Sequence, residues 1–156
     1  MRVKYNELMG LDSVGPVKGQ ITRQYPYLLA VNGYQYQYTF EPRDGYILAS
    51  LSIKAMVKLE CQRCLGELEV VVDRQSELAL VKNHSLLDDL MQDYECVEIE
   101  EDIDLSEIAD DELLLSLPYS HEALEECDKA SLAYLEKSVE VERKINPFAQ
   151  LAELIE

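Results

Sequence analysis

Residues 46–60, YILASLSIKAMVKLE, decide the fold, because apolar side chains recur at every second position over most of this stretch. One set of alternating positions holds Leu51, Ile53, Ala55, Val57 and Leu59, and the other holds Ser52, Lys54, Met56 and Lys58. Successive side chains of a β-strand point to opposite faces of a sheet, so a period of two indicates a strand with one buried face. The stretch therefore predicts one long β-strand whose second face is largely polar.

A second long strand is predicted over residues 67–81, ELEVVVDRQSELALV, shortly after the first. The residues between the two strands, 61–66, must reverse the chain. Gly66 suits such a reversal, because glycine adopts backbone angles that other residues avoid. The two strands therefore predict a long hairpin with residues 61–66 at its tip.

The residues that precede this hairpin also alternate. Tyr34, Tyr36 and Tyr38 are separated by glutamines, so the three rings are expected to point from one face of an earlier strand. Asn32-Gly33 supplies the positive φ angles of a two-residue hairpin turn, and Asp44-Gly45 offers a second turn. The first half of the chain is thus expected to be rich in strands.

The second half changes to helical patterns. Helices are predicted over residues 85–92, 102–118 and 146–156, and a short strand over residues 93–101. In the longest of these helices, Asp104 is a candidate N-cap with Glu107 three residues on, an arrangement that resembles a capping box, and Pro118 ends the helix.

These patterns predict an α+β fold: an antiparallel β-sheet or partial barrel, with a long hairpin carrying a Cys-x-x-Cys pair at its tip, followed by helices. The length fits a single domain over residues 1–156. That domain would be strand-rich over residues 18–82, and acidic and helix-rich over residues 83–156.

The net charge of −17 is distributed unevenly along the chain. Residues 1–74 hold nine Lys/Arg and eight Asp/Glu, for +1, whereas residues 75–156 hold five Lys/Arg and twenty-three Asp/Glu, for −18. An acidic half repels nucleic acid, so any RNA contact is expected in the first half.

No membrane or export signal is visible in the sequence. No apolar run reaches the roughly 18 residues that a membrane-spanning helix needs, and the N-terminal stretch lacks the apolar middle of a signal peptide. We therefore expect a cytoplasmic monomer without a membrane partner, in a compartment where paired cysteines are more often metal ligands or redox groups than disulfides.

Cys61 and Cys64 form a Cys-x-x-Cys pair in the predicted reversal, which is a common half-site for zinc. Two other interpretations stay open. The cysteines can be small, partly buried turn residues. A redox pair is less favoured, because thioredoxin-like chemistry places the pair at a helix N-terminus, and here it follows a strand.

The other half of a zinc site has to come from later in the chain. His121 and Cys127 lie in a polar segment after the predicted helix and can reach one ion together, whereas Cys96 sits in an alternating strand and His84 in a polar turn. The proposed zinc ligands are Cys61, Cys64, His121 and Cys127.

The rest of the sequence contains no recognisable catalytic set, so we expect no enzymatic activity. The acidic run Asp110–Glu112 suggests metal-carboxylate chemistry at first sight. Only one of three consecutive helical residues faces a given site, however, so a solvated acidic face is the better interpretation.

Several stretches taken in order, LECQRCLGELEV, DYECVEIEEDIDLSEIADDELLLSLPYSHEALEEC and NPFAQLAELI, resemble the bacterial YceD family of large ribosomal RNA subunit accumulation proteins. The resemblance covers roughly residues 45–156. It implies a role in the synthesis, processing or accumulation of 23S ribosomal RNA and no enzymatic activity. Many relatives carry cysteines where this chain has His121 and Cys127, which fits ligand positions for structural zinc. This chain lacks the further downstream cysteines of some relatives.

Two hypotheses for the partner follow. The first is a ribosome-assembly factor that binds ribosomal RNA, its precursor or a ribosome-assembly protein. Its RNA-binding face would comprise Lys54, Lys58, Arg63 and Arg74, beside tyrosines such as Tyr34, Tyr36 and Tyr38 that could stack on bases. The alternative is an acidic interaction module that docks on a basic ribosomal or nucleic-acid-processing protein without touching RNA.

Overall fold

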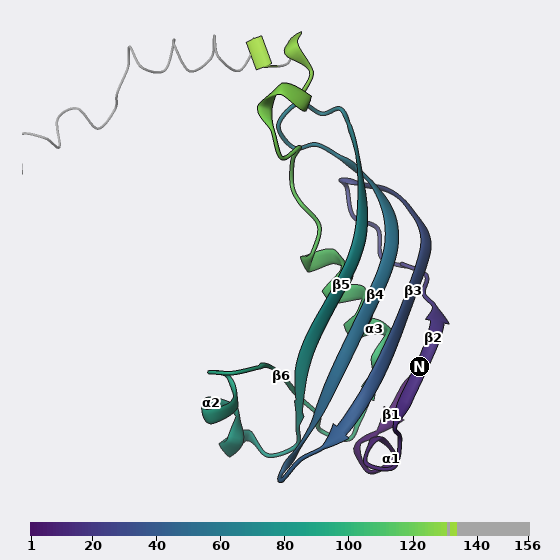
Figure 1. Cartoon of the computed structure of the whole chain (residues 1–156), viewed down its shortest axis with the longest axis vertical. Helices are drawn as coiled ribbons and strands as arrows, with labels where there is room; N and C mark the ends of the chain where they lie inside the picture. The colour runs from purple at the N-terminus through teal and green to yellow at the C-terminus, as the bar shows by residue number, and fades with distance from the viewer. Residues whose placement is uncertain (131, 134–156) are drawn as a thin grey trace, which may run out of the picture. The chain divides into compact units, whose positions relative to one another are not determined.

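A computed structural model describes residues 1–130 and 132–133 of the chain, and they form a mixed α+β fold (Figure 1). The strands are β1 (Arg2–Lys4), β2 (Ser13–Lys18), β3 (Leu28–Pro42), β4 (Tyr46–Glu60), β5 (Glu67–Val81), β6 (Glu95–Glu98) and β7 (Asp102–Asp104). The helices are α1 (Tyr5–Leu8), α2 (Leu87–Leu90) and α3 (Leu105–Leu115), with 3-10 turns η1 (His84–Leu86) and η2 (Leu124–Glu126). The predicted helix over residues 146–156 lies outside the described residues.

Five strands form one sheet in the order β2-β3-β4-β5-β6, and β1 pairs with β7 in a separate two-stranded sheet. The pairs β2/β3 and β3/β4 are antiparallel, whereas β6 runs parallel to β5. The two long predicted strands are confirmed as β4 and β5 with their predicted bounds. In the described part of the chain the sheet is open and not closed into a barrel, since β2 and β6 are its two ends.

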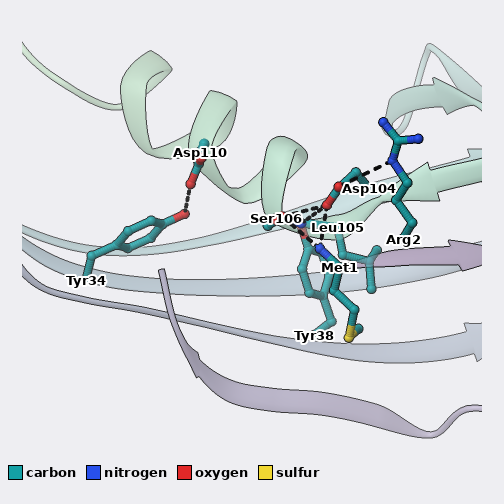
Figure 2. Close-up of polar contacts among 8 residues, drawn as sticks. All are labelled: Met1, Arg2, Tyr34, Tyr38, Asp104, Leu105, Ser106 and Asp110. Atoms are coloured by element: carbon teal, nitrogen blue, oxygen red, sulfur yellow. Dashed lines mark hydrogen bonds and ion pairs between the residues drawn. The ribbon is translucent and has the colours of Figure 1, made fainter. Parts of the chain in front are cut away.

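One face of this sheet is buried, as the alternation in the sequence predicts. The predicted apolar set of β4 is buried throughout, and the three alternating tyrosines of β3 are buried beside it. Helix α3 packs on this face: the Tyr34 hydroxyl donates to Asp110 Oδ1 over 2.8 Å, and the Tyr38 hydroxyl donates to the Leu105 carbonyl over 2.8 Å (Figure 2). These rings therefore belong to the core and do not form an exposed surface for stacking on RNA bases.

The prediction of a hairpin turn at Asn32-Gly33 is wrong. Both residues lie inside β3, where the register against β4 shifts between Asn32 and Gln35, and Gly33 adopts a φ of 63°. The dipeptide thus supplies the left-handed residue of a bulge, a use of glycine that the sequence shares with tight turns. Asp44-Gly45 does form the predicted turn, between β3 and β4.

The start of α3 confirms Asp104 as N-cap, because its Oδ1 accepts from the Ser106 backbone N–H over 3.0 Å. The same carboxylate accepts from the amino group of Met1 over 2.6 Å (Figure 2). Hydrogen bonds from that amino group and from Ser106 lower the pKa of Asp104 to about 2. Glu107, by contrast, forms an ion pair with Arg23.

The prediction that Asp110–Glu112 form a solvated acidic face is wrong for two of the three residues. Glu112 is buried, where it accepts from the Ser76 hydroxyl over 2.6 Å and lies 3.8 Å from Arg74 Nε. Asp110 is half-buried under Tyr34, and Asp111 alone is exposed, where it pairs with Arg23. The run therefore joins α3 to β3, β5 and the segment before β3.

The chain forms two compact units. The first comprises Met1–Leu59 and Glu69–Leu117, and the second comprises Glu60–Leu68 and the described residues from Pro118 onward. Two compact units can form one domain or two, so the single domain over residues 1–156 stays a prediction. Within residues 1–130 and 132–133, no helix has both the length and the apolar character needed to cross a bilayer.

Candidate metal centre

The Cys-x-x-Cys pair lies in the segment that connects β4 to β5. The Cys61 N–H donates to the Gly66 carbonyl over 2.8 Å, and the Leu65 N–H donates to the Cys61 carbonyl over 2.8 Å, so this segment closes on itself as a tight turn. The left-handed residue of the turn is Leu65, with a φ of 59°, and not Gly66 as expected. Gly66 instead packs closely against the second cysteine, because a Cβ at this position would lie 3.4 Å from Cys64 Sγ.

The segment after Pro118 supplies the other two candidate ligands. The Gln62 N–H donates to the Tyr119 carbonyl over 2.8 Å, which ties this segment to the Cys-x-x-Cys turn. The short turn η2 then leads the chain back to Cys127, whose N–H donates to the Leu124 carbonyl. His121 and Cys127 thereby reach the same place as the cysteine pair, as the sequence predicted.

The four side chains lie close enough together to bind one metal ion. Their ligand atoms all lie within 4.8 Å of one another. His121 Nδ1 lies 3.7 Å from Cys64 Sγ and 3.5 Å from Cys127 Sγ. A tetrahedral zinc ion with its usual bond lengths holds a nitrogen and a sulfur about 3.6 Å apart. The two nitrogen–sulfur distances therefore match this geometry, and three thiols with one imidazole are a donor set that zinc takes.

Burial gives this cluster an apolar surrounding. All three cysteines are buried, and Leu68 and Leu132 pack against them. Burial raises the pKa of the Cys61 thiol, but hydrogen bonds from the backbone of His121, Cys64 and Arg63 outweigh it and bring the pKa to about 6. Burial also raises the pKa of Cys127. Backbone N–H groups of His121 and of the turn thus stabilise one thiolate, as backbone groups around metal-binding cysteines do.

Arg63 lies beside the cluster and contacts the segment after Pro118. One guanidinium nitrogen donates to Ser120 Oγ over 3.0 Å, and the other points to Cys127 Sγ at 3.9 Å. The arginine between the two cysteines therefore lies against a candidate ligand, Cys127, whereas the role predicted for it was RNA binding. The sequence signal for a position at the metal centre was that Arg63 lies between the two cysteines of the pair.

The comparisons with known proteins identify the family. The family profile described as "Large ribosomal RNA subunit accumulation protein YceD" matches residues 49–155, well over half of the chain. The chain belongs to the YceD family. Neither the curated proteins nor the solved structures contain a match. All four candidate ligands of this YceD protein lie inside the matched region.

The two remaining potential ligands do not join the centre. Cys96 lies half-buried in β6, packed near Ala79, Val81 and Leu87. His84 is exposed, and its Nδ1 lies 3.4 Å from Glu98 Oε2. Both residues therefore occupy the places that the sequence predicted for them, a half-buried strand position and a polar turn.

Of the four predicted RNA-binding cations of this YceD protein, Lys54 and Lys58 lie on the other face of the sheet from Arg74. Lys54 and Lys58 lie within 3.2 Å and 3.8 Å of carboxylate oxygens of β5, those of Asp73 and Glu69. Arg74 belongs to the opposite face of β5, where it contacts the buried carboxylate of α3. Arg63 lies at the metal centre. Their RNA-binding role stays a prediction.

Proposed function

We propose that this YceD protein is a non-catalytic, cytoplasmic factor that supports accumulation of 23S ribosomal RNA during assembly of the large ribosomal subunit. The family match supports the link to ribosomal RNA. The observation that carries the proposal further is the cluster of three cysteines and one histidine inside the matched region. We propose that this cluster holds a structural zinc ion, which fixes the turn between β4 and β5 to the segment after Pro118.

Metal analysis of the full chain, purified without chelator, tests the zinc site. We expect about one zinc per chain, because the four ligand atoms complete a tetrahedral shell. Cys64→Ser should lose most of the metal, whereas Cys96→Ser is the matched control and should keep it, since Cys96 lies outside the cluster. Metal well below one per chain, with all thiols readily alkylated, would contradict the zinc proposal.

The ribosomal role is tested in a bacterial host that lacks its own copy of the gene. Production of the wild-type chain should restore the ratio of 23S to 16S ribosomal RNA. If the zinc-dependent turn carries the function, Cys64→Ser should fail to restore the ratio and Cys96→Ser should succeed. Restoration by both variants would separate the ribosomal role from the metal centre.

Direct RNA binding would use the four predicted cations and should weaken steeply with salt, because bound phosphates release counterions. Neutralising Lys58, Arg63 and Arg74 together should reduce affinity for 23S fragments. Unchanged affinity in the triple variant would remove the predicted RNA face.

A second candidate function is docking on a basic protein partner without contact to RNA. Two observations favour it. Lys54, Lys58 and Arg74 each lie beside a carboxylate, which weakens their attraction for phosphate. The acidic second half of the chain, with a net charge of −18, complements a basic protein. Recovery of a basic ribosomal protein with the purified chain, together with no binding to 23S fragments, would favour this candidate.

A further inference from the structure

The two ends of the five-stranded sheet are protected to different degrees. At one end, β2 carries Pro16, which has no N–H to offer, and its register shifts between Val14 and Val17. A proline and an irregular register are common devices that prevent an edge strand from pairing with another chain. This end of the sheet is therefore closed to further strands.

The other end of the sheet is built differently. The last strand, β6, is short and pairs only with Leu78–Val81 of β5. Figure 1 shows β5 continuing well beyond the short β6. Over residues 69–77, no strand of the described chain pairs with the side of β5 that faces away from β4. This stretch contains no proline, so its outward N–H and C=O groups form an open edge that another strand can extend.

The side chains along this edge indicate what kind of strand would fit. Glu69, Asp73 and Glu77 lie four residues apart on the exposed face of β5, opposite to the face that α3 covers, with Val71 and Gln75 between them. Lys54 and Lys58 belong to β4, the neighbour of β5 on the side away from the open edge. They form exposed ion pairs with Asp73 and Glu69, and such pairs contribute little to stability. No ion pair involving Glu77 is formed within residues 1–130 and 132–133.

We propose that residues 69–77 of β5 are a docking edge that binds an extended, lysine- or arginine-rich segment of a protein partner by strand addition. Backbone hydrogen bonds supply the pairing, and the three carboxylates select basic side chains at every fourth position of the added strand. This proposal rests on the second candidate function, docking on a basic protein, and specifies how such a partner would bind. Its test below leaves the zinc and ribosomal RNA tests untouched, so the proposals can fail separately.

A second copy of the chain is a poor occupant of the same edge. In an antiparallel pair of two β5 edges centred on Asp73, the two Asp73 side chains face each other and Glu69 faces Glu77. Like charges directly opposite one another destabilise a strand pair. The carboxylates therefore act against self-association and in favour of a basic partner.

The test uses the full wild-type chain and a short synthetic peptide in which lysine alternates with threonine or valine. Binding is followed by fluorescence anisotropy at low salt, and the location by hydrogen–deuterium exchange. We expect slower exchange within residues 69–77 on binding and no change over β2. A peptide of the same charge that carries N-methyl groups on both edges should bind about tenfold more weakly or worse, because it cannot form the ladder of hydrogen bonds.

Variants of the protein locate the charge recognition. Asp73→Asn combined with Glu77→Gln should weaken binding of the lysine peptide, whereas the matched control Glu100→Gln with Glu101→Gln, which removes the same charge elsewhere, should not. Equal binding of the plain and N-methylated peptides would mean that charge alone attracts the peptide, and would overturn strand addition. Unchanged exchange over residues 69–77, or a dimer of the free chain protected over these residues, would overturn the docking edge as proposed.

Discussion

Replacing Arg63 by glutamine should weaken zinc binding by about 10- to 100-fold, if the four-residue cluster holds zinc. A site of three thiolates, one neutral imidazole and Zn²⁺ carries one net negative charge, and metal binding creates the Cys127 thiolate. The guanidinium of Arg63, at 3.9 Å from Cys127 Sγ, is the cation that offsets this charge. Its second nitrogen is held by Ser120 Oγ, so the group is kept in place.

The magnitude follows from that distance. Two unit charges about 4 Å apart interact with about 4 kcal/mol at an effective dielectric constant of about 20. Arg63 is only half-buried, so solvent screens part of this energy. Loss of a group that supports a metal ligand typically costs about 10- to 100-fold in metal affinity, which corresponds to roughly 1.4–2.8 kcal/mol and fits the screened value.

The assay is competition for zinc between the purified chain and a chromophoric chelator. Arg43→Gln is the matched control, because it removes the same charge from an exposed arginine that pairs with Glu41. Arg63→Lys should fall between wild type and Arg63→Gln, because it keeps the charge and loses the fork that spans Ser120 and Cys127. Equal zinc affinity of wild type and Arg63→Gln, combined with loss of RNA binding, would refute this reasoning and restore the residue to an RNA-binding role.

Substitutions at four further positions test the fold. Leu65→Asn should raise the free energy of unfolding by about 1 kcal/mol in urea titrations. Leu65 is exposed and has a left-handed backbone conformation that asparagine adopts more readily. Leu65→Val should lower the free energy of unfolding, and an increase with valine would contradict the argument. Tyr34→Phe should lower the free energy of unfolding by about 2 kcal/mol, because its hydroxyl donates to a carboxylate. Tyr38→Phe should lower it by about 1 kcal/mol, because its hydroxyl donates to a neutral carbonyl. The reverse order in urea titrations would contradict these contacts. Asp104→Asn should cost about 2 kcal/mol at pH 7, since the folded pKa of about 2 lies below the unfolded value near 3.9. That stability is present above the unfolded pKa and is lost as the pH falls toward 2, so the difference between wild type and Asp104→Asn should shrink over this range; a difference independent of pH would rule out the carboxylate as its source.

The long strands could be read from the sequence because their signal is local. In β4 the alternation of apolar and polar residues is nearly unbroken, and a single buried face is enough to produce it. The bulge at Asn32-Gly33 could not be read in the same way. A glycine with positive φ serves both a hairpin turn and a bulge, and the choice depends on the pairing of β3 with β4, which is not a local property.

The metal cluster was predictable because chemistry limits the choice of ligands. With Cys96 in an alternating strand and His84 in a polar turn, only the segment after Pro118 could supply the missing pair. The positions of the cations were missed for a different reason. Arg74 shares its face of β5 with Val72, which is buried, so the same period of two that located the strands also separates Arg74 from Lys54 and Lys58.

Burial of Glu112 also had a signal in the sequence. It follows Leu105 by seven residues and precedes Leu113, and all three are buried on one side of α3. A carboxylate at such a position requires partners, which here are the Ser76 hydroxyl and the Arg74 guanidinium of β5. The acidic run is therefore better understood as part of the packing between helix and sheet than as a surface charge.

The family match begins at residue 49, inside β4, so β1, β2 and β3 lie outside it. Helix α3 lies inside the matched region, yet the face it covers is completed by rings from β3. Without those rings, Asp110 would lose the hydroxyl that it accepts from and the Leu105 carbonyl would lose its donor. The strands before residue 49 are thus part of the same core as the matched region. The tyrosines of β3 are constrained by burial and by hydrogen bonding to α3, which is why they serve the fold.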